Sequence, residues 1–191
     1  MPRRFLVLTL ALVAAAGCLG TQTDPTRFFV LSPVAPPAGP PATVAPPTLG
    51  LGPIKMPDYL DQTAVVTRIT EQEIDYQPSA RWAERLSVMV SRTLAVNLAA
   101  RTGGRETVSY PWPADRQPAI TAAVDFVRFD MTREGTAVLR AQWRVTQGDA
   151  LRTGVARIDE PAADTTMDAR VGALNRALAK LSDELAAAIR P

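Results

Sequence analysis

The chain has 191 residues, 47% of them apolar, with 21 basic and 19 acidic side chains, no histidine and one cysteine. Without histidine, and with a single thiol, the sequence excludes Cys/His zinc sites, serine–histidine triads and cysteine–histidine catalysis. The charges nearly balance and no run of Lys or Arg occurs, so a nucleic-acid-binding role has little support. The length suits one compact domain.

Residues 1–17 have the parts of a bacterial export signal. Arg3 and Arg4 give it a basic start, residues 5–13 are apolar, and small residues lead up to Cys18. The apolar run is too short to cross a membrane, which takes about 20 residues. Small residues directly before the only cysteine resemble a bacterial lipoprotein signal, which predicts cleavage before Cys18 and attachment of lipid to its thiol. An ordinary secretory signal with a leftover cysteine is the alternative.

The lipid predicted at Cys18 would anchor the mature chain to a membrane through a short lipidated tether, residues 18–26. Each buried methylene adds about 0.8 kcal/mol to membrane binding, so several acyl chains on one cysteine would make dissociation very slow. Leu19 follows the cysteine. In enterobacterial lipoproteins an Asp at that position favours retention in the inner membrane, so the resemblance implies the outer membrane here, with the folded domain in the periplasm.

Two segments follow the tether. Residues 27–32 are aromatic-rich and predict a strand near the anchor. Residues 33–47 contain seven prolines among fifteen residues, which predicts an extended, semi-rigid loop without a hydrogen-bond ladder. We interpret this proline-rich loop as the connection that lets the strand reach the sheet. A proline-rich ligand for a binding module is the alternative.

A pair of strands is predicted next, at residues 49–54 and 64–70, where apolar and β-branched side chains lie between Gly and Pro residues. Residues 56–61 between them predict a turn, because Pro57 lacks an N–H group and the nearby acids can bond to the backbone. A short strand at residues 73–76 is expected to end at Pro78.

The first helix is predicted from Ser79, as the N-cap, to Thr102, since no Pro or Gly interrupts this segment. One stripe of apolar residues is expected in the core: Trp82, Leu86, Met89, Val90, Thr93 and Leu98. Arginines occupy the opposite side, which is expected to face water.

Four further strands are predicted at residues 106–110, 119–131, 137–147 and 150–159, the last three joined by tight turns containing Gly135 and Gly148. Within the second of them the apolar phase shifts to Val127, Phe129 and Met131. Such a shift predicts a bulge or a strand buried on both faces.

A short aromatic segment separates the first two of these strands. Tyr110 and Trp112 alternate with Pro111 and Pro113, and the rigid prolines would hold both rings as a surface patch. The alternative is that Trp112 plugs the edge of the core.

The last helix is predicted after Thr165, which forms a capping-box pattern with Asp168. One of its faces is apolar over about five turns: Val171, Leu174, Leu178, Leu181, Leu185 and Ile189. Packing on the sheet is the expected role of this face, and a coiled-coil or partner helix is the alternative. The order of elements predicts a single α/β domain over residues 27–191, a mixed and mainly antiparallel sheet with two long helices packed on it.

Several short motifs together resemble one family. They are Pro57-Asp58-Tyr59-Leu60, an apolar strand that ends at Arg68, Arg81-Trp82-Ala83-Glu84, Tyr110-Pro111-Trp112, and the strand from Val124 to Phe129. In combination they resemble the paraquat-inducible protein C family, also called the ABC-type transport auxiliary lipoprotein component.

The resemblance covers most of residues 27–189 and implies a non-catalytic accessory protein. It implies a complex with a mammalian-cell-entry-type (MCE) protein that carries phospholipid between the inner and outer membranes, in some members with an ABC ATPase. The expected partners are a membrane, through the lipid on Cys18, and the MCE-domain protein, and a homo-oligomeric ring would suit a tubular partner. No cofactor and no nucleic-acid partner are expected.

The family motifs also give the candidate partner-binding residues, which are Pro57, Asp58, Tyr59, Leu60, Trp82 and Trp112. The alternative for two of them is that Tyr59 and Trp82 meet in the core and define the fold. For the function as a whole, the alternative is an envelope lipoprotein that regulates or assists assembly of the cell wall or of lipopolysaccharide.

An enzyme is not expected. A hydrolase that uses only carboxylates would have to draw on the acids clustered in sequence at Asp58, Asp61, Glu71, Glu73 and Asp75. Nothing in their spacing selects a pair. Gly50-Leu51-Gly52 precedes a proline turn, so it does not match a dinucleotide-binding loop.

Overall fold

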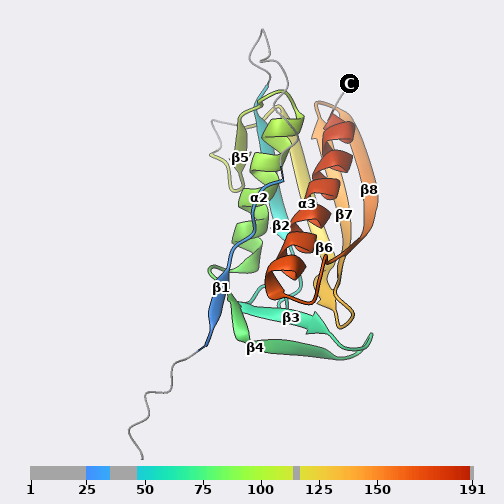
Figure 1. The fold of residues 1–191 in the computed structure, drawn as a ribbon. Helices are drawn as coiled ribbons and strands as arrows, with labels where there is room; N and C mark the ends of the chain where they lie inside the picture. The colour runs from blue at the N-terminus through green and yellow to red at the C-terminus, as the bar shows by residue number, and fades with distance from the viewer. Residues whose placement is uncertain (1–24, 35–46, 114–116, 190–191) are drawn as a thin grey trace, which may run out of the picture.

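The computed structural model describes residues 25–34, 47–113 and 117–189, so Cys18 and most of the proline-rich loop lie outside the described residues. The described part forms one sheet and two helices (Figure 1). In chain order the elements are β1 (Arg27–Phe29), β2 (Leu49–Lys55), β3 (Ala64–Arg68), β4 (Ile74–Trp82), α2 (Leu86–Arg101), β5 (Thr107–Ser109), β6 (Ile120–Thr132), β7 (Thr136–Gln147), β8 (Ala150–Pro161) and α3 (Met167–Ile189). The predicted α/β fold is confirmed.

Strand β6 organises the sheet. On one side it pairs antiparallel with β7 along most of its length, and β7 pairs antiparallel with β8. On the other side β6 pairs in parallel with β2 and, near its end, with β3. Parallel β5 lies beside β2, while antiparallel β4 and then parallel β1 extend from β3. The longest ladders are therefore antiparallel, as predicted.

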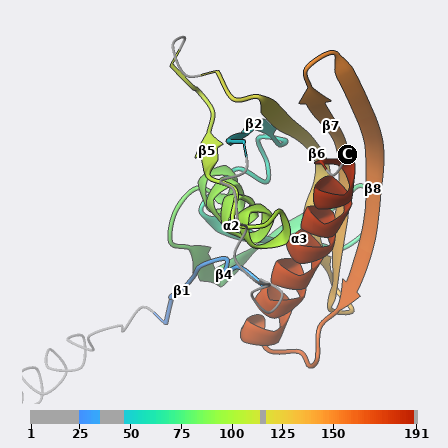
Figure 2. The same ribbon diagram turned by 90° about the horizontal axis from the view of Figure 1, so that it is seen from above.

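Both helices cover the same face of this sheet, and Figure 2 shows them on one side of β6, β7 and β8. Helix α3 packs on β6, β7 and β8, and α2 packs on α3, β2 and β5. The apolar face predicted for α3 is buried at all six positions. Its cap is Thr166 and not the predicted Thr165, because the Thr166 hydroxyl accepts a hydrogen bond from the Ala169 N–H at 3.2 Å.

The phase shift predicted within β6 is a bulge. The register with β7 shifts between Phe126 and Arg128, so one residue of β6 has no partner opposite it. Phe126 and Phe129 on either side of the bulge are both buried, and their ring centroids lie 5.7 Å apart. Val127, the first residue of the shifted apolar phase, is 56% exposed because the bulge turns it away from the helices.

The N-cap position of helix α2 is Arg85, six residues after the predicted cap Ser79, so this prediction was wrong. Residues 73–82 do not end at Pro78 as a strand, since β4 continues to Trp82 and residues 80–82 pair with β1. The register between β3 and β4 shifts in this region, and such an irregularity tolerates a proline without an N–H group. Ser79 therefore lies in a strand and caps no helix.

The start of α2 is capped from a distant loop. The residue before the helix, Arg85, has no side-chain cap of its own. Instead the Asp61 carboxylate accepts a hydrogen bond from the Ser87 N–H at 3.0 Å and contacts the Arg85 guanidinium at 2.6 Å. The turn at residues 56–61 thus holds the first turn of α2 in place, and a carboxylate there suits the positive end of the helix dipole.

We expect Asp61→Ala to lower the free energy of unfolding by about 1 kcal/mol at pH 7. Burial alone would raise the pKa of the Asp61 carboxyl, but the hydrogen bonds from Ser87 and the contact with Arg85 outweigh it and lower this pKa. The carboxylate therefore contributes stability above about pH 4, which is lost as the pH falls through the lowered folded-state pKa.

Urea unfolding of both proteins between neutral and acid pH measures this effect, with the exposed acid of the same turn, Asp58→Ala, as the control. The difference between wild type and Asp61→Ala should shrink at the acid end. A difference that stays constant with pH, or an equal loss in Asp58→Ala, would contradict the assignment of the cap.

Candidate partner-binding surfaces

The turn at residues 56–61 is held firmly against the body of the domain. The Pro57 carbonyl accepts hydrogen bonds from the N–H groups of Leu60 (2.9 Å) and Asp61 (3.2 Å). The Leu60 side chain is fully buried, so it anchors the turn in the core. Asp58 is exposed and Pro57 is partly exposed. Of the four predicted residues of this turn, Pro57, Asp58 and part of Tyr59 can be reached by a partner.

Tyr59 is fixed by a buried ion-pair network. Its hydroxyl accepts a hydrogen bond from the Arg68 guanidinium at 2.9 Å, and the same guanidinium contacts the Asp130 carboxylate at 2.9 Å. Arg128 contacts the second oxygen of Asp130 at 2.8 Å. Burial raises the pKa of Tyr59 and outweighs the opposite effect of Arg68, so the phenol stays protonated at neutral pH. The network positions the turn, and sequence reasoning missed it.

Trp82 lies at the end of β4 and is buried, with 3% of its surface exposed. Its backbone N–H donates a hydrogen bond to the Thr63 carbonyl, which ties β4 to the loop before β3. A partner could therefore not contact Leu60 or Trp82 directly. These two residues could affect binding only by stabilising the fold.

Trp112 lies near the other end of β2, so the six predicted residues do not form one cluster. Its ring covers Gly50, where an added Cβ would lie 2.4 Å from the indole Nε1, and it meets the Tyr110 ring edge-on at a centroid distance of 5.0 Å. Trp112 is partly buried while Tyr110 is 56% exposed. At this corner of the sheet Trp112 therefore covers β2, as in the alternative of an edge plug, while Tyr110 is an exposed aromatic ring, as in the predicted surface patch.

An apolar groove runs from this corner along α2, and sequence reasoning missed it. It has a volume of about 630 Å³ and lies between α2 and β2. Val88 and Val96 on the helix are 44% and 47% exposed, and Ile54 and Tyr110 face them. The signal was present in the sequence, because Val88 and Val96 are apolar residues outside the stripe that was predicted to face the core.

The five clustered acids do not assemble into a catalytic pair. Asp61 is engaged by Ser87 and Arg85, and Glu71, Glu73 and Asp75 are exposed around the β3–β4 hairpin. Within residues 25–34, 47–113 and 117–189, no three carboxylates gather where they could hold a metal ion. The described helices are not long and apolar enough to cross a membrane.

Comparisons with known proteins place this fold. A crystal structure of an uncharacterized protein matches with a TM-score of 0.72 at 20% identity, over 86% of this chain and 99% of that one. Protein XCC0632 from Xanthomonas campestris matches with a TM-score of 0.64 at 16% identity, over 84% and 93%. At such identities the likeness shows the fold alone. No curated protein matches the sequence.

The family assignment comes from the sequence of the folded domain. The family described as the ABC-type transport auxiliary lipoprotein component matches residues 29–186, which run from β1 into the last turns of α3. This span is most of the chain and contains every motif that carried the resemblance. The chain therefore belongs to the ABC-type transport auxiliary lipoprotein component family.

Proposed function

We propose that this chain is a non-catalytic lipoprotein of the outer membrane that docks on an MCE-type protein and assists the passage of phospholipid between the two membranes. The membership in a family of transport auxiliary lipoproteins carries this proposal. The small residues before Cys18 support a lipid anchor, and Leu19 supports the outer membrane. The acyl chains would hold the domain at the bilayer while its periplasmic surface meets the partner.

We assign the docking surface to the apolar groove along α2 and the corner beside it. Val88 and Val96 are exposed on a helix whose opposite side is already buried in the core. Exposed apolar patches bounded by polar residues mark interaction sites. Tyr110 and Trp112 at one end and the turn residues Pro57, Asp58 and Tyr59 at the other would add contacts, and a ring of several copies would suit a tubular partner.

The test is cross-linked affinity purification from membranes. Wild type should recover an MCE-type protein, and Cys18→Ala should recover less because the domain is no longer held at the bilayer. Val96→Asp should reduce recovery by about tenfold, since a charge buried in an apolar interface costs more than about 1.4 kcal/mol. Val127→Asp is the matched control, because Val127 is also an exposed valine (56%, against 47% for Val96) and lies far from α2.

Two outcomes would overturn the proposal. Recovery of cell-wall or lipopolysaccharide machinery in place of an MCE-type protein would favour the assembly role instead. Equal recovery with Val96→Asp and with Val127→Asp would remove the groove as the docking surface. Cross-linked oligomers of the chain itself, recovered without the partner, would support the proposed ring.

A further inference from the structure

The face of the sheet opposite the helices carries a row of arginines. Arg128, Arg140 and Arg157 lie side by side in register across β6, β7 and β8. Like charges directly opposite each other destabilise a sheet. Asp130 offsets Arg128 and Asp159 offsets Arg140, both at 2.8 Å, whereas Arg157 has no ion pair within the described residues. This face is therefore more cationic than the chain as a whole.

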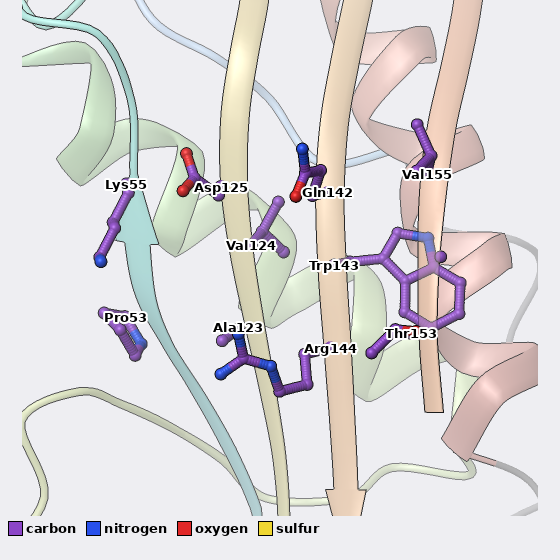
Figure 3. A pocket seen from close by; sticks show the side chains of 11 residues that line it. Pro53, Lys55, Ala123, Val124, Asp125, Gln142, Trp143, Arg144, Thr153 and Val155 are labelled. Atoms are coloured by element: carbon purple, nitrogen blue, oxygen red, sulfur yellow. The ribbon is translucent and has the colours of Figure 1, made fainter. Parts of the chain in front are cut away.

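Beside this row the same face has a hollow of about 320 Å³ (Figure 3). Lys55 of β2 and Arg144 of β7 lie on either side of Ala123 of β6, which forms a small floor between them. Both cations are exposed, and neither has an ion pair or a side-chain hydrogen bond to another described residue. An anionic group could thus reach both without displacing an existing partner.

A single carboxylate lies at another side of the hollow. Asp125 is two residues along β6 from Ala123, a separation of about 7 Å, and it is the register partner of Lys55 and Gln142. Figure 3 shows its carboxylate at the rim, beside Lys55 and away from Arg144. The hollow therefore offers two cations for an anion and one carboxylate for a nearby cation.

We propose that this hollow binds the phosphoethanolamine headgroup of a phospholipid. The phosphate lies between Lys55 and Arg144, and the ammonium group, two methylenes away from the ester oxygen, meets Asp125. The volume fits a headgroup and not a whole lipid. The apolar part has a surface to lie on, because Val155 at the edge of the hollow and Leu151 beyond it are each 60% exposed. This inference names the class of lipid for the proposed transport function. Its biological role rests on that function, whereas the binding site itself does not.

The test is a chemical-shift titration of the isotope-labelled, full mature lipoprotein in a neutral detergent. Glycerophosphoethanolamine should shift the amide signals of residues 123–125 and 142–144 in a saturable way. Lys55→Gln and Arg144→Gln should each weaken binding by about threefold to fivefold, as expected for an exposed charge pair. Asp125→Asn should weaken the binding of glycerophosphoethanolamine but not the binding of glycerol 3-phosphate, which lacks the ammonium group. Arg157→Gln, on the same face but outside the hollow, is the matched control.

Several results would overturn this inference, and none of them depends on an MCE-type partner. The absence of saturable shifts at residues 123–125 would exclude the site. An equal loss in Arg157→Gln would indicate attraction to the whole cationic face. Glycerophosphoethanolamine binding to Asp125→Asn as tightly as to wild type would exclude the role of Asp125. A second titration uses micelles doped with phosphatidylethanolamine. If the soluble headgroup binds but this lipid in the micelles does not, the lipid is excluded as the source of the headgroup.

Discussion

Asp130→Ala is expected to lower the free energy of unfolding by about 3–5 kcal/mol. The Asp130 side chain is completely buried, and its two oxygens meet Arg68 at 2.9 Å and Arg128 at 2.8 Å. Its removal would leave two arginine side chains, 14% and 17% exposed, of which Arg128 keeps only a contact with the exposed Glu71 carboxylate at 3.7 Å. A buried charge without a partner costs far more than the pair contributes, and a domain has only about 5–15 kcal/mol in total.

Urea unfolding at neutral pH measures this loss, with Asp75→Ala as the control because Asp75 is an exposed acid on the neighbouring strand β4. The control should stay within about 0.5 kcal/mol of wild type. In an Arg68→Ala background Asp130→Ala should lower the free energy of unfolding by less, since only Arg128 then loses its buried carboxylate partner. Equal losses in Asp130→Ala and Asp75→Ala, or strict additivity with Arg68→Ala, would mean that the network does not act as a unit.

Elements that depend on local pattern could be predicted from the sequence. The apolar face of α3 repeats every three to four residues, and all six of its positions are buried. The strands of the β6–β7–β8 meander alternate and are joined by turns of three and two residues, so their order and pairing follow from neighbouring residues. The bulge in β6 was visible as a shift of apolar phase.

Elements that depend on distant partners could not be predicted in this way. Pro78 and Ser79 have the local pattern of a strand end and a helix cap, but the end of β4 pairs with β1, more than fifty residues earlier in the chain. The cap of α2 comes from Asp61, and the partner of Arg68 is Asp130, 62 residues away. No periodicity within one segment reports such contacts.

The candidate surfaces also differ in whether a local sequence pattern could predict them. Family motifs identified the turn at residues 56–61 and the Trp112 corner, but they could not separate exposed members such as Asp58 from buried ones such as Trp82. The groove along α2 has a local signal in Val88 and Val96, which lie outside the single apolar stripe predicted for this helix. The hollow beside Lys55 depends on the register of four strands and has no signal in any single segment.

A second large effect is expected at the cross-strand pair of Trp143 and Gly154. The two residues are register partners on the helix-facing side of β7 and β8, and the indole lies directly over the glycine. A Cβ at position 154 would come within 2.3 Å of the ring atom Cζ2. The ring cannot simply turn aside, because its Nε1 donates a hydrogen bond to Glu184 of α3 at 3.2 Å.

Gly154→Ala is therefore expected to lower the free energy of unfolding by about 1–3 kcal/mol through overpacking, although alanine is normally the better strand residue. A double-mutant cycle in urea unfolding separates the two contributions. In a Trp143→Ala background the added methyl group meets no ring, so the same substitution should become neutral or stabilise the fold by about 0.5–1 kcal/mol. The expected result is thus a change of sign. A loss of the same size in both backgrounds would mean that Gly154 is required by its backbone, and that the indole of Trp143 does not select it.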